Sequence, residues 1–283
     1  MKRLVPFLLI ISIISFSSET LAGGAYQFSM LPRYSSEEIN RRISPLAGYL
    51  SKKIGIIIEP IIINNFAQYE KRLKNGTIQI GYENPYIYVL VSGTHEVLAM
   101  ANKGKSGDRF RGIIIAKKDS KILTVDDLKN KNICVVGRTS AGGYLSQKLT
   151  LMQTGIDVER DCQIMEAVDN KQENVIFSVL TGEADAGFIR ESALHQADRF
   201  VPPSKIRVIS RTAWLPNWAL SVKRSLPKET KKAIQDALIG LKEGGPVLKA
   251  LRIKGFRMAT DEEYDVVRQA AGMAISKKKE PKK

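Results

Sequence analysis

Cysteine and histidine are scarce in this sequence, which has two residues of each type among 283. This scarcity excludes a fold held together by several disulfides and a metal site built from a cluster of cysteines and histidines. The patterns Gly-x-Ser-x-Gly and His-Glu-x-x-His are missing too, and neither His95 nor His195 accompanies a nucleophile motif. We therefore expect a protein that is not an enzyme and needs no cofactor; the enzymatic alternative is a catalytic arrangement formed only in space.

Long apolar runs are also lacking, since no segment approaches the ~20 apolar residues needed to cross a bilayer. The first 22 residues have the pattern of a secretory signal. Lys2 and Arg3 precede the apolar run 8–14, and small residues lie around Ala22. We expect cleavage near Ala22 and export to the periplasm, with an uncleaved membrane anchor as the alternative. A bacterial lipoprotein is not expected, because no cysteine lies near this site.

Acidic residues are outnumbered, with 29 Asp and Glu against 44 Lys and Arg, which gives a net charge of +15. Such a charge favours nucleic acid, a membrane surface or anionic small molecules as partners. Export makes nucleic acid a poor candidate, which leaves a membrane surface or a small anionic ligand. The lysine-rich tail 277–283 is expected to be disordered and to aid solubility.

Apolar residues are plentiful at 43%, and they occur in alternating strand-like and helix-like segments. Ser35 and Gly55 are expected to bound one helix, and Ser140 and Thr260 to begin two others. The alternation implies βαβ units and runs through the chain twice, which predicts two α/β lobes, each a mostly parallel sheet flanked by helices. Strands are expected at residues 26–31, 56–63, 79–82, 97–101, 112–116, 133–136, 163–165, 186–189, 206–209 and 219–222.

The segment Gly137–Gly143 follows one of these strands and opens a helix. The start of a helix presents N–H groups without intrahelical partners, together with a partial positive charge, and an oxyanion can accept these bonds directly. Thr139 and Ser140 add hydroxyl groups, and the small Ala141 allows close approach. The alternative is ordinary capping by Ser140, with the glycines serving packing.

Two further strand ends carry polar side chains that could face a ligand, because ligands bind beyond the carboxyl ends of strands in open sheets. The first, residues 81–88, offers three tyrosines and Asn84, of which at least one tyrosine is expected in the core. The second ends in Arg190, which could clamp an oxyanion, and Glu191, which could select a cationic group or pair with Arg190. Trp214 and Trp218 either gate a cleft or pack a hinge.

Cys134 and Cys162 are the only two cysteines. Both are expected near the starts of neighbouring strands, and the periplasm permits disulfides. The alternatives are therefore one disulfide or two small buried residues.

The order of several motifs resembles the periplasmic solute-binding components of phosphate/phosphite/phosphonate-type ABC importers. Residues 138–141 resemble the family's Ser-Thr-Ser-Gly anion loop, and residues 123–131 its Asp-Leu-Lys-Gly-Lys run. Other matching segments are 31–32 with 44–50, 66–88, 179–187 and 255–264. The resemblance extends over Tyr26–Ala274, nearly the whole sequence after the expected signal.

This resemblance implies a type II-like periplasmic binding protein, with two lobes joined by a two-stranded hinge. We expect one lobe to comprise residues 25–111 plus 222–276, and the other residues 112–221. The ligand would bind between them, and closure would deliver it to an inner-membrane ABC permease. A monomer is also implied. A ligand-sensing component of a signalling system, or a binder of a non-phosphorus organic solute, are the functional alternatives.

The sequence departs from the family at positions that affect specificity. Asn84 stands where the family has glycine, Arg138 replaces the first serine of the anion loop, and Gln172 falls in the place of a histidine. Asn217 replaces an acidic residue of some aminophosphonate binders, which disfavours an amine-bearing ligand. The candidate ligand-binding residues are Tyr34, Tyr82, Asn84, Tyr86, Tyr88, Arg138, Thr139, Ser140, Ala141, Gln172, Arg190, Glu191 and Asn217.

Overall fold

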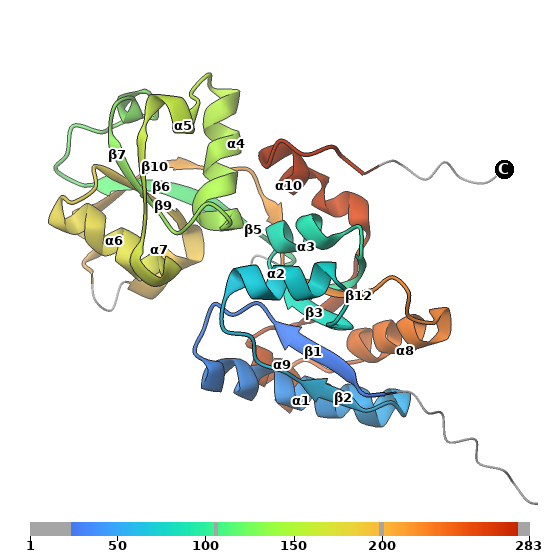
Figure 1. Ribbon diagram of the computed structural model, residues 1–283. Coiled ribbons are helices and arrows are strands. Elements are labelled where there is room, and N and C mark those ends of the chain that lie inside the picture. Colours follow the sequence, from blue (N-terminus) through green and yellow to red (C-terminus); the bar gives the residue numbers. More distant parts are fainter. Residues whose placement is uncertain (1–23, 105–106, 198–200, 277–283) are drawn as a thin grey trace, which may run out of the picture.

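The computed structural model describes residues 24–104, 107–197 and 201–276. The expected signal and the lysine-rich tail lie outside these ranges. The described chain forms two groups of helices and strands, each around its own sheet (Figure 1). We call the group around the six-stranded sheet the first lobe, and the group around the five-stranded sheet the second lobe.

The first sheet is mixed, with strand order β13-β4-β12-β3-β1-β2. Only the pairs of β1 with β2 and with β3 are parallel, whereas β12 runs antiparallel to both β3 and β4. Strands β1, β2, β3 and β4 run in one direction, as the expected mostly parallel sheet requires, whereas β12, which returns from the second lobe, and β13 run in the opposite direction. The strands are β1 (Tyr26–Met30), β2 (Ile58–Pro60), β3 (Ile80–Glu83), β4 (His95–Asn102), β12 (Ala219–Lys223) and β13 (Gly255–Met258).

The second sheet is mixed as well, with the order β10-β6-β9-β7-β8. Strand β7 is parallel to β8 and β9, while β6 is antiparallel to β9 and β10. Its strands are β6 (Gly112–Lys117), β7 (Asn132–Val135), β8 (Gln163–Glu166), β9 (Ala186–Arg190) and β10 (Ile206–Arg211).

A two-stranded antiparallel ribbon joins the lobes, formed by β5 (Arg109–Phe110) and β11 (Leu215–Pro216). The expected boundary between residues 221 and 222 falls inside β12, which belongs wholly to the first sheet. An apolar cluster surrounds the ribbon. It includes Phe110 and Leu215 of the ribbon and Ala141 from the loop after β7. The ribbon is thus packed into the protein.

Helices cover both sheets, and their boundaries follow the capping signals. Ser35 accepts the N–H of Glu38 at the start of α1, and Gly55 ends this helix in the left-handed region with φ of 72°. The first lobe contains α1 (Ser36–Ile54), α2 (Phe66–Lys74), α3 (Pro85–Val91), α8 (Lys228–Ile239) and α9 (Pro246–Leu251). The second contains α4 (Ser146–Gln153), α5 (Val158–Asp161), α6 (Gln172–Thr181) and α7 (Glu191–Ala197). Helix α10 (Asp265–Ala270) packs against both α3 and α4, so it contacts both lobes.

The strand expected over 56–63 is reduced to the three residues of β2. Strand β2 lies at the edge of the sheet and pairs only with β1, and Ile57 beside it is 67% exposed. Helix α1 continues through Pro45. Within the described ranges, no helix combines the length and the apolar character that crossing a membrane requires.

The two cysteines are free, so the disulfide alternative is wrong. Successive side chains of a strand point to opposite faces, and Cys134 on β7 packs with the apolar cluster on one face of the second sheet. Cys162 belongs to the cluster on the other face, where its thiol lies 3.2 Å from the main-chain oxygen of Leu128. The sheet itself separates the two sulfur atoms.

Candidate functional site

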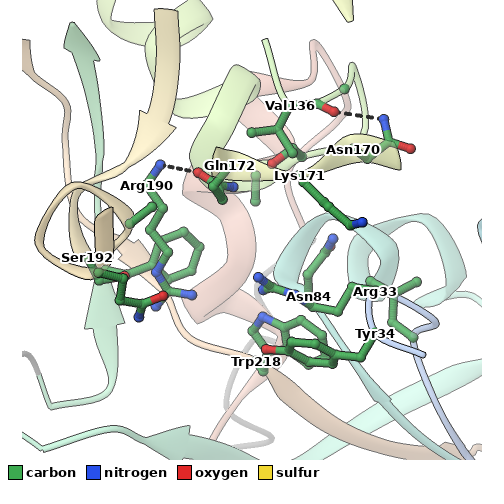
Figure 2. Close-up of a pocket in the computed structure, with 18 of the residues that line it drawn as sticks. Arg33, Tyr34, Asn84, Val136, Asn170, Lys171, Gln172, Arg190, Ser192 and Trp218 are labelled. Carbon is green, nitrogen blue, oxygen red and sulfur yellow. Dashed lines mark hydrogen bonds between the residues drawn. The ribbon is translucent and has the colours of Figure 1, made fainter. Parts of the chain in front are cut away.

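A hollow of about 850 Å³ lies between the lobes and is lined by residues of both. Figure 2 shows Arg33, Tyr34, Asn84 and Trp218 of the first lobe on one side, with Gln172 and Arg190 of the second lobe facing them. We call this space the interlobe hollow. Of the thirteen candidate residues, eight line it: Tyr34, Asn84, Thr139, Ser140, Ala141, Gln172, Arg190 and Glu191.

The second-lobe wall contains the loop that follows β7. Ser140 has extended backbone geometry, and its hydroxyl oxygen accepts the N–H of Gly143 at 3.1 Å. A wide, π-type turn over Ala141–Leu145 follows and continues into α4. The first N–H groups of this helix have no preceding turn to accept them. Because Thr139–Gly142 line the hollow, these donors lie where an oxyanion can reach them.

Glycine is required in this loop by packing as well as by ligand access. A Cβ atom on Gly142 would lie 2.7 Å from the ring of Phe110, and one on Gly143 would lie 2.4 Å from Val136. The backbone of the loop therefore rests directly against the ribbon and against β7. The glycines therefore serve packing, as the alternative interpretation proposed, and the same loop also lines the hollow.

Gln147 fixes this loop from beneath. Its side chain is fully buried, and its Nε2 atom donates to the carbonyl oxygens of Ile113, Gly142 and Ile189 at 3.0–3.1 Å. Its Oε1 atom accepts the hydroxyl of Ser146 at 2.9 Å. One neutral side chain thus ties the loop to both β6 and β9, which keeps the helix start in a set orientation.

Arg190 stands beside the loop at the end of β9. Its guanidinium carbon lies 3.9 Å from the centre of the Phe110 ring, and its main-chain N–H donates to Gln172 Oε1 at 2.7 Å. The Nε atom is buried, and among the described residues neither it nor the rest of the guanidinium has a hydrogen-bond or carboxylate partner. Burial, with the nearby charge of Arg33, lowers the pKa of Arg190 to about 9. This buried cation is free to take an anion.

Glu191 does not pair with Arg190, although the two are adjacent in the sequence. Its carboxylate binds Arg111 at 2.7 and 2.9 Å and Arg211 at 3.1 Å. The hydrogen bonds from Arg111 hold the pKa of this carboxyl below its usual range. Trp214, 41% exposed at the rim, lies 4.7 Å from the guanidinium of Arg111. Glu191 is therefore satisfied by cations and is not available to a cationic group on a ligand.

The first-lobe wall presents cations on aromatic rings. The guanidinium of Arg33 lies 5.0 Å from the ring centre of Tyr34 and 5.6 Å from that of Trp218, and Lys103 Nζ lies 5.8 Å from Trp218. Trp218 is 3% exposed and packs 5.2 Å from the Tyr82 ring. Asn84 caps α3 by accepting the N–H of Ile87 at 2.9 Å. Trp218 is thus a packing residue beneath the hollow.

The charge of the hollow is strongly positive, since eight basic and three acidic residues line it. Two of the three carboxylates, Glu38 and Glu191, are held in ion pairs. Among the described residues, no carboxylate forms an ion pair with Arg33, Lys103 or Arg190. The site therefore suits an anion, and this surplus matches the basic composition of the chain.

Arg138, predicted as a ligand residue, does not line the hollow. Its exposed side chain reaches Glu159 at 3.2 Å and Glu166 at 3.5 Å on the surface of the second lobe. The turn after β7 directs residue 138 outward and residues 139–142 inward. The departure from the family's serine at this position therefore adds no charge to the hollow.

Four other predicted residues lie in the core or pack against it instead. Tyr82 and Tyr88 are 2% and 0% exposed, and the hydroxyl of Tyr88 donates to Asp261 at 2.7 Å. Tyr86 packs against the apolar clusters next to α10. Asn217 is fully buried beside the ribbon, where its Oδ1 accepts the N–H of Trp218 at 3.0 Å. Tyr82 and Tyr88 therefore pack in the core, where at least one tyrosine of residues 81–88 was expected.

The sequence analysis missed Arg33 and Lys103, although a usable signal existed. Arg33 follows the carboxyl end of β1, and Lys103 follows that of β4. Strands β1, β3 and β4 run in one direction, since β12 is antiparallel to both β3 and β4. The rule that pointed to Asn84, which follows β3, applies equally to the ends of these two strands.

The comparisons with known proteins agree with this geometry. Residues 28–264 match the family model described as ABC transporter, phosphonate, periplasmic substrate-binding protein. This match covers most of the chain, so the chain belongs to that family. The fold of two α/β lobes expected from the resemblance is confirmed.

Two solved structures share the fold across nearly all of their length. A Xanthomonas citri protein bound to ATP has a TM-score of 0.74 and 19% identity, covering 88% of this chain and 96% of that one. PhnD1 from Prochlorococcus marinus in complex with methylphosphonate has a TM-score of 0.72 and 14% identity, covering 88% and 97%. These identities support the fold alone.

A curated relative belongs to a different functional class. The tetrathionate sensor histidine kinase TtrS of Salmonella typhimurium is 24% identical over 183 residues, which cover 62% of this chain. The matched region is 28% of the kinase, so the chain spans less than a third of that relative's length.

Proposed function

We propose that this protein is an extracytoplasmic solute-binding protein that captures a phosphorus oxyanion between its lobes and passes it to an ABC importer. The family to which the chain belongs supports periplasmic location, solute binding and a permease in the inner membrane as partner. The candidate ligands are phosphonates, phosphite and phosphate.

The observation that supports this proposal most directly is the placement of Thr139, Ser140 and Ala141 beside the unpaired Arg190. Hydroxyl groups and main-chain N–H groups donate hydrogen bonds from fixed positions, and a tetrahedral oxyanion accepts several of them at once. Arg190 supplies a full charge next to these neutral donors. This combination favours a phosphorus oxyanion over a neutral solute.

Closure of the lobes follows from the position of the hollow. A ligand that contacts the anion loop of the second lobe and Tyr34 or Asn84 of the first interacts with both walls only when they approach each other. Such a ligand stabilises the closed state by this difference in contacts. The two-strand ribbon of β5 and β11 is where the change in angle would occur.

The test is isothermal titration calorimetry on protein freed of bound solute by unfolding and refolding. The panel is phosphate, phosphite, methylphosphonate and sulfate. We expect at least one phosphorus oxyanion to bind, and Arg190→Gln to weaken it by about 10- to 100-fold, because a charged hydrogen bond contributes ~1.5–3 kcal/mol. Arg138→Gln is the matched control and should leave affinity unchanged, since Arg138 lies outside the hollow.

Absence of binding by every phosphorus compound would reject the proposal. A weakening by Arg138→Gln as large as that by Arg190→Gln would reject the assigned site. Mass spectrometry of the solute that co-purifies with the untreated protein gives an independent answer, and it would also reveal a non-phosphorus organic solute.

Ligand sensing is the second candidate function, and the similarity to the TtrS sensor kinase is the observation that favours it. In cells that carry the gene, deletion separates the two candidates. Loss of uptake of the radiolabelled ligand supports import. Normal uptake with a lost transcriptional response to the ligand supports sensing.

A further inference from the structure

Two cations of the first-lobe wall are left without carboxylate partners. Arg42 and Arg252, on the same wall, both pair with Glu38, at 2.8 and 3.2 Å. Arg33 and Lys103 form no ion pair with any described residue, and both line the interlobe hollow. This wall therefore has two kinds of cation. Arg42 and Arg252 are paired with Glu38, whereas Arg33 and Lys103 face the hollow without a described carboxylate partner.

Aromatic rings hold these unpaired cations in place. Trp218 lies within 6 Å of both the Arg33 guanidinium and Lys103 Nζ, and Tyr34 carries Arg33 as well. Because Trp218 is almost fully covered and packs on Tyr82, its ring is not free to stack on an aromatic ligand. The indole therefore positions charge on this wall, and a base-stacking role is disfavoured.

The three unpaired cations act on one another through the hollow. Lys103 is exposed and lines this space. Burial and the charges of Arg190, Arg33 and Arg42 lower its pKa well below the ordinary value. The arrangement is electrostatically unfavourable when no anion is present, and it improves with each negative charge that enters.

We infer that the ligand carries a second anionic group, which binds Arg33 and Lys103 on the first lobe while its phosphorus oxyanion binds the anion loop and Arg190 on the second. The chemical class is a small organic phosphonate or phosphate with a carboxylate at the other end. This inference rests on the proposed function, because it extends the ligand assigned there. Each lobe would then bind one anionic group of the ligand, and the ligand would bridge the two lobes.

Amine-bearing ligands are disfavoured by the same wall. A substituent ammonium group would meet Arg33 and Lys103, whose charge has the same sign. The acidic residues of the hollow offer little compensation, since Glu38 and Glu191 are held in ion pairs. Glu173 is the remaining one, and it is exposed in the first turn of α6.

The experiment compares four compounds by calorimetry on the refolded full chain: methylphosphonate, phosphonoacetate, 2-aminoethylphosphonate and succinate. We expect phosphonoacetate to bind about tenfold tighter than methylphosphonate, because one charge-assisted interaction is gained, and 2-aminoethylphosphonate to bind weakest of the phosphonates. Arg33→Gln should remove about tenfold of the phosphonoacetate affinity and leave methylphosphonate within about threefold. Arg252→Gln is the control, because this lining residue is paired with Glu38.

Equal affinity for methylphosphonate and phosphonoacetate would overturn the second anion subsite and leave the proposed function intact. Equal weakening of both phosphonates by Arg33→Gln would overturn it as well, because Arg33 would then act on the first anion. Binding of succinate without any phosphonate would overturn the assignment of a phosphonate with a carboxylate, and it would reject the proposed function if phosphate and phosphite also fail to bind. Silence across all four compounds would overturn the second anion subsite, and the proposed function would then depend on phosphate and phosphite alone.

Discussion

A buried polar side chain supports each wall of the hollow, Gln147 in the second lobe and Glu83 in the first, and their hydrogen bonds differ. In the second lobe, Gln147 makes hydrogen bonds with both ends of its amide and ties down Gly142. In the first lobe, Glu83 precedes Asn84 and is also fully buried; its Oε2 accepts the hydroxyl of Tyr69 at 2.9 Å, but its Oε1 has no partner among the described residues. A neutral, satisfied group lies behind one wall and a titratable, partly satisfied group behind the other.

The amide of Gln147 does not titrate, so its support of the second-lobe wall does not depend on pH, whereas the carboxyl group of Glu83 behind the first-lobe wall can gain or lose a proton. Burial raises the pKa of Glu83 to about 8, against the hydrogen bonds of Ser221 and Tyr69, which favour the charged form. His95 lies in the same network, 3.0 Å from Ser221 Oγ, and burial lowers its pKa to about 4. Both groups are therefore uncharged in the folded protein near neutral pH.

The largest effect is expected from Gln147→Leu. The substitution keeps the volume but leaves three carbonyl oxygens without their buried donor, so we expect the free energy of unfolding to fall by about 2–4 kcal/mol. The anion loop should also lose its fixed orientation, and affinity for the ligand should fall with it. Urea unfolding and calorimetry measure the two effects.

Gln153→Leu, at the exposed end of the same helix, is the matched control. It should change the free energy of unfolding by less than about 0.5 kcal/mol. If Gln147→Leu were as mild as this control, the loop would not depend on the buried amide.

The next largest effect is the dependence of wild-type stability on pH, which Glu83→Gln should remove. Because the folded-state pKa of Glu83 lies above its ordinary 4.5, the folded protein holds a proton that the unfolded chain releases, and stability falls as pH rises from 4.5 to 8. His95 contributes an opposite slope only between about 4 and 6.5. From pH 6.5 to 8 the wild type should therefore lose up to about 2 kcal/mol relative to Glu83→Gln.

The measurement is urea unfolding of both proteins at four pH values across this window. Glu59→Gln, at an exposed position of β2, serves as the control and should follow the wild type. Parallel stability curves for the wild type and Glu83→Gln would show that Glu83 does not titrate in this range.

The smallest effect is expected from Ser140→Ala, which tests the anion loop itself. Loss of the cap should cost ~0.5–2 kcal/mol of stability. Loss of a hydroxyl facing the hollow should in addition weaken the ligand by about 2- to 12-fold, the range for one neutral hydrogen bond. Thermal unfolding and calorimetry separate the two.

Asn65→Ala removes a comparable cap from α2, where Asn65 accepts the N–H of Gln68 at 2.9 Å outside the hollow. It should lower stability and leave affinity unchanged. An identical result for Ser140→Ala would reduce Ser140 to a capping residue and exclude it from the ligand site.

Much of the local structure could be predicted, because its causes lie within a few residues. The caps at Ser35, Ser140 and Thr260 and the stop at Gly55 follow from side-chain chemistry and backbone freedom. The alternation of strands and helices gave the two α/β lobes. The mixed direction of the sheets could not be predicted in this way, because it depends on β12 inserting between β3 and β4 from far along the chain.

The sequence predicted the site residues that lie at strand ends and face the hollow. It failed for residues whose polar groups pair with distant segments of the chain. Residues 139–141 follow β7, Arg190 is the last residue of β9, and all of them line the hollow. Tyr88 lies in α3, the helix that follows β3, and its hydroxyl donates to Asp261, which is 173 residues away. Sequence position alone does not tell which neighbour a polar side chain will meet.

The sequence by itself determined the basic character of the protein, its alternating elements and the helix start after β7. Only the tertiary structure decided which cations are available to a ligand. Arg138 and Arg190 both stand at strand ends, but Glu159 and Glu166 reach the first, and no described carboxylate reaches the second. The physical reason is that an ion pair needs two groups within a few ångströms, and folding sets that distance between segments far apart in the chain.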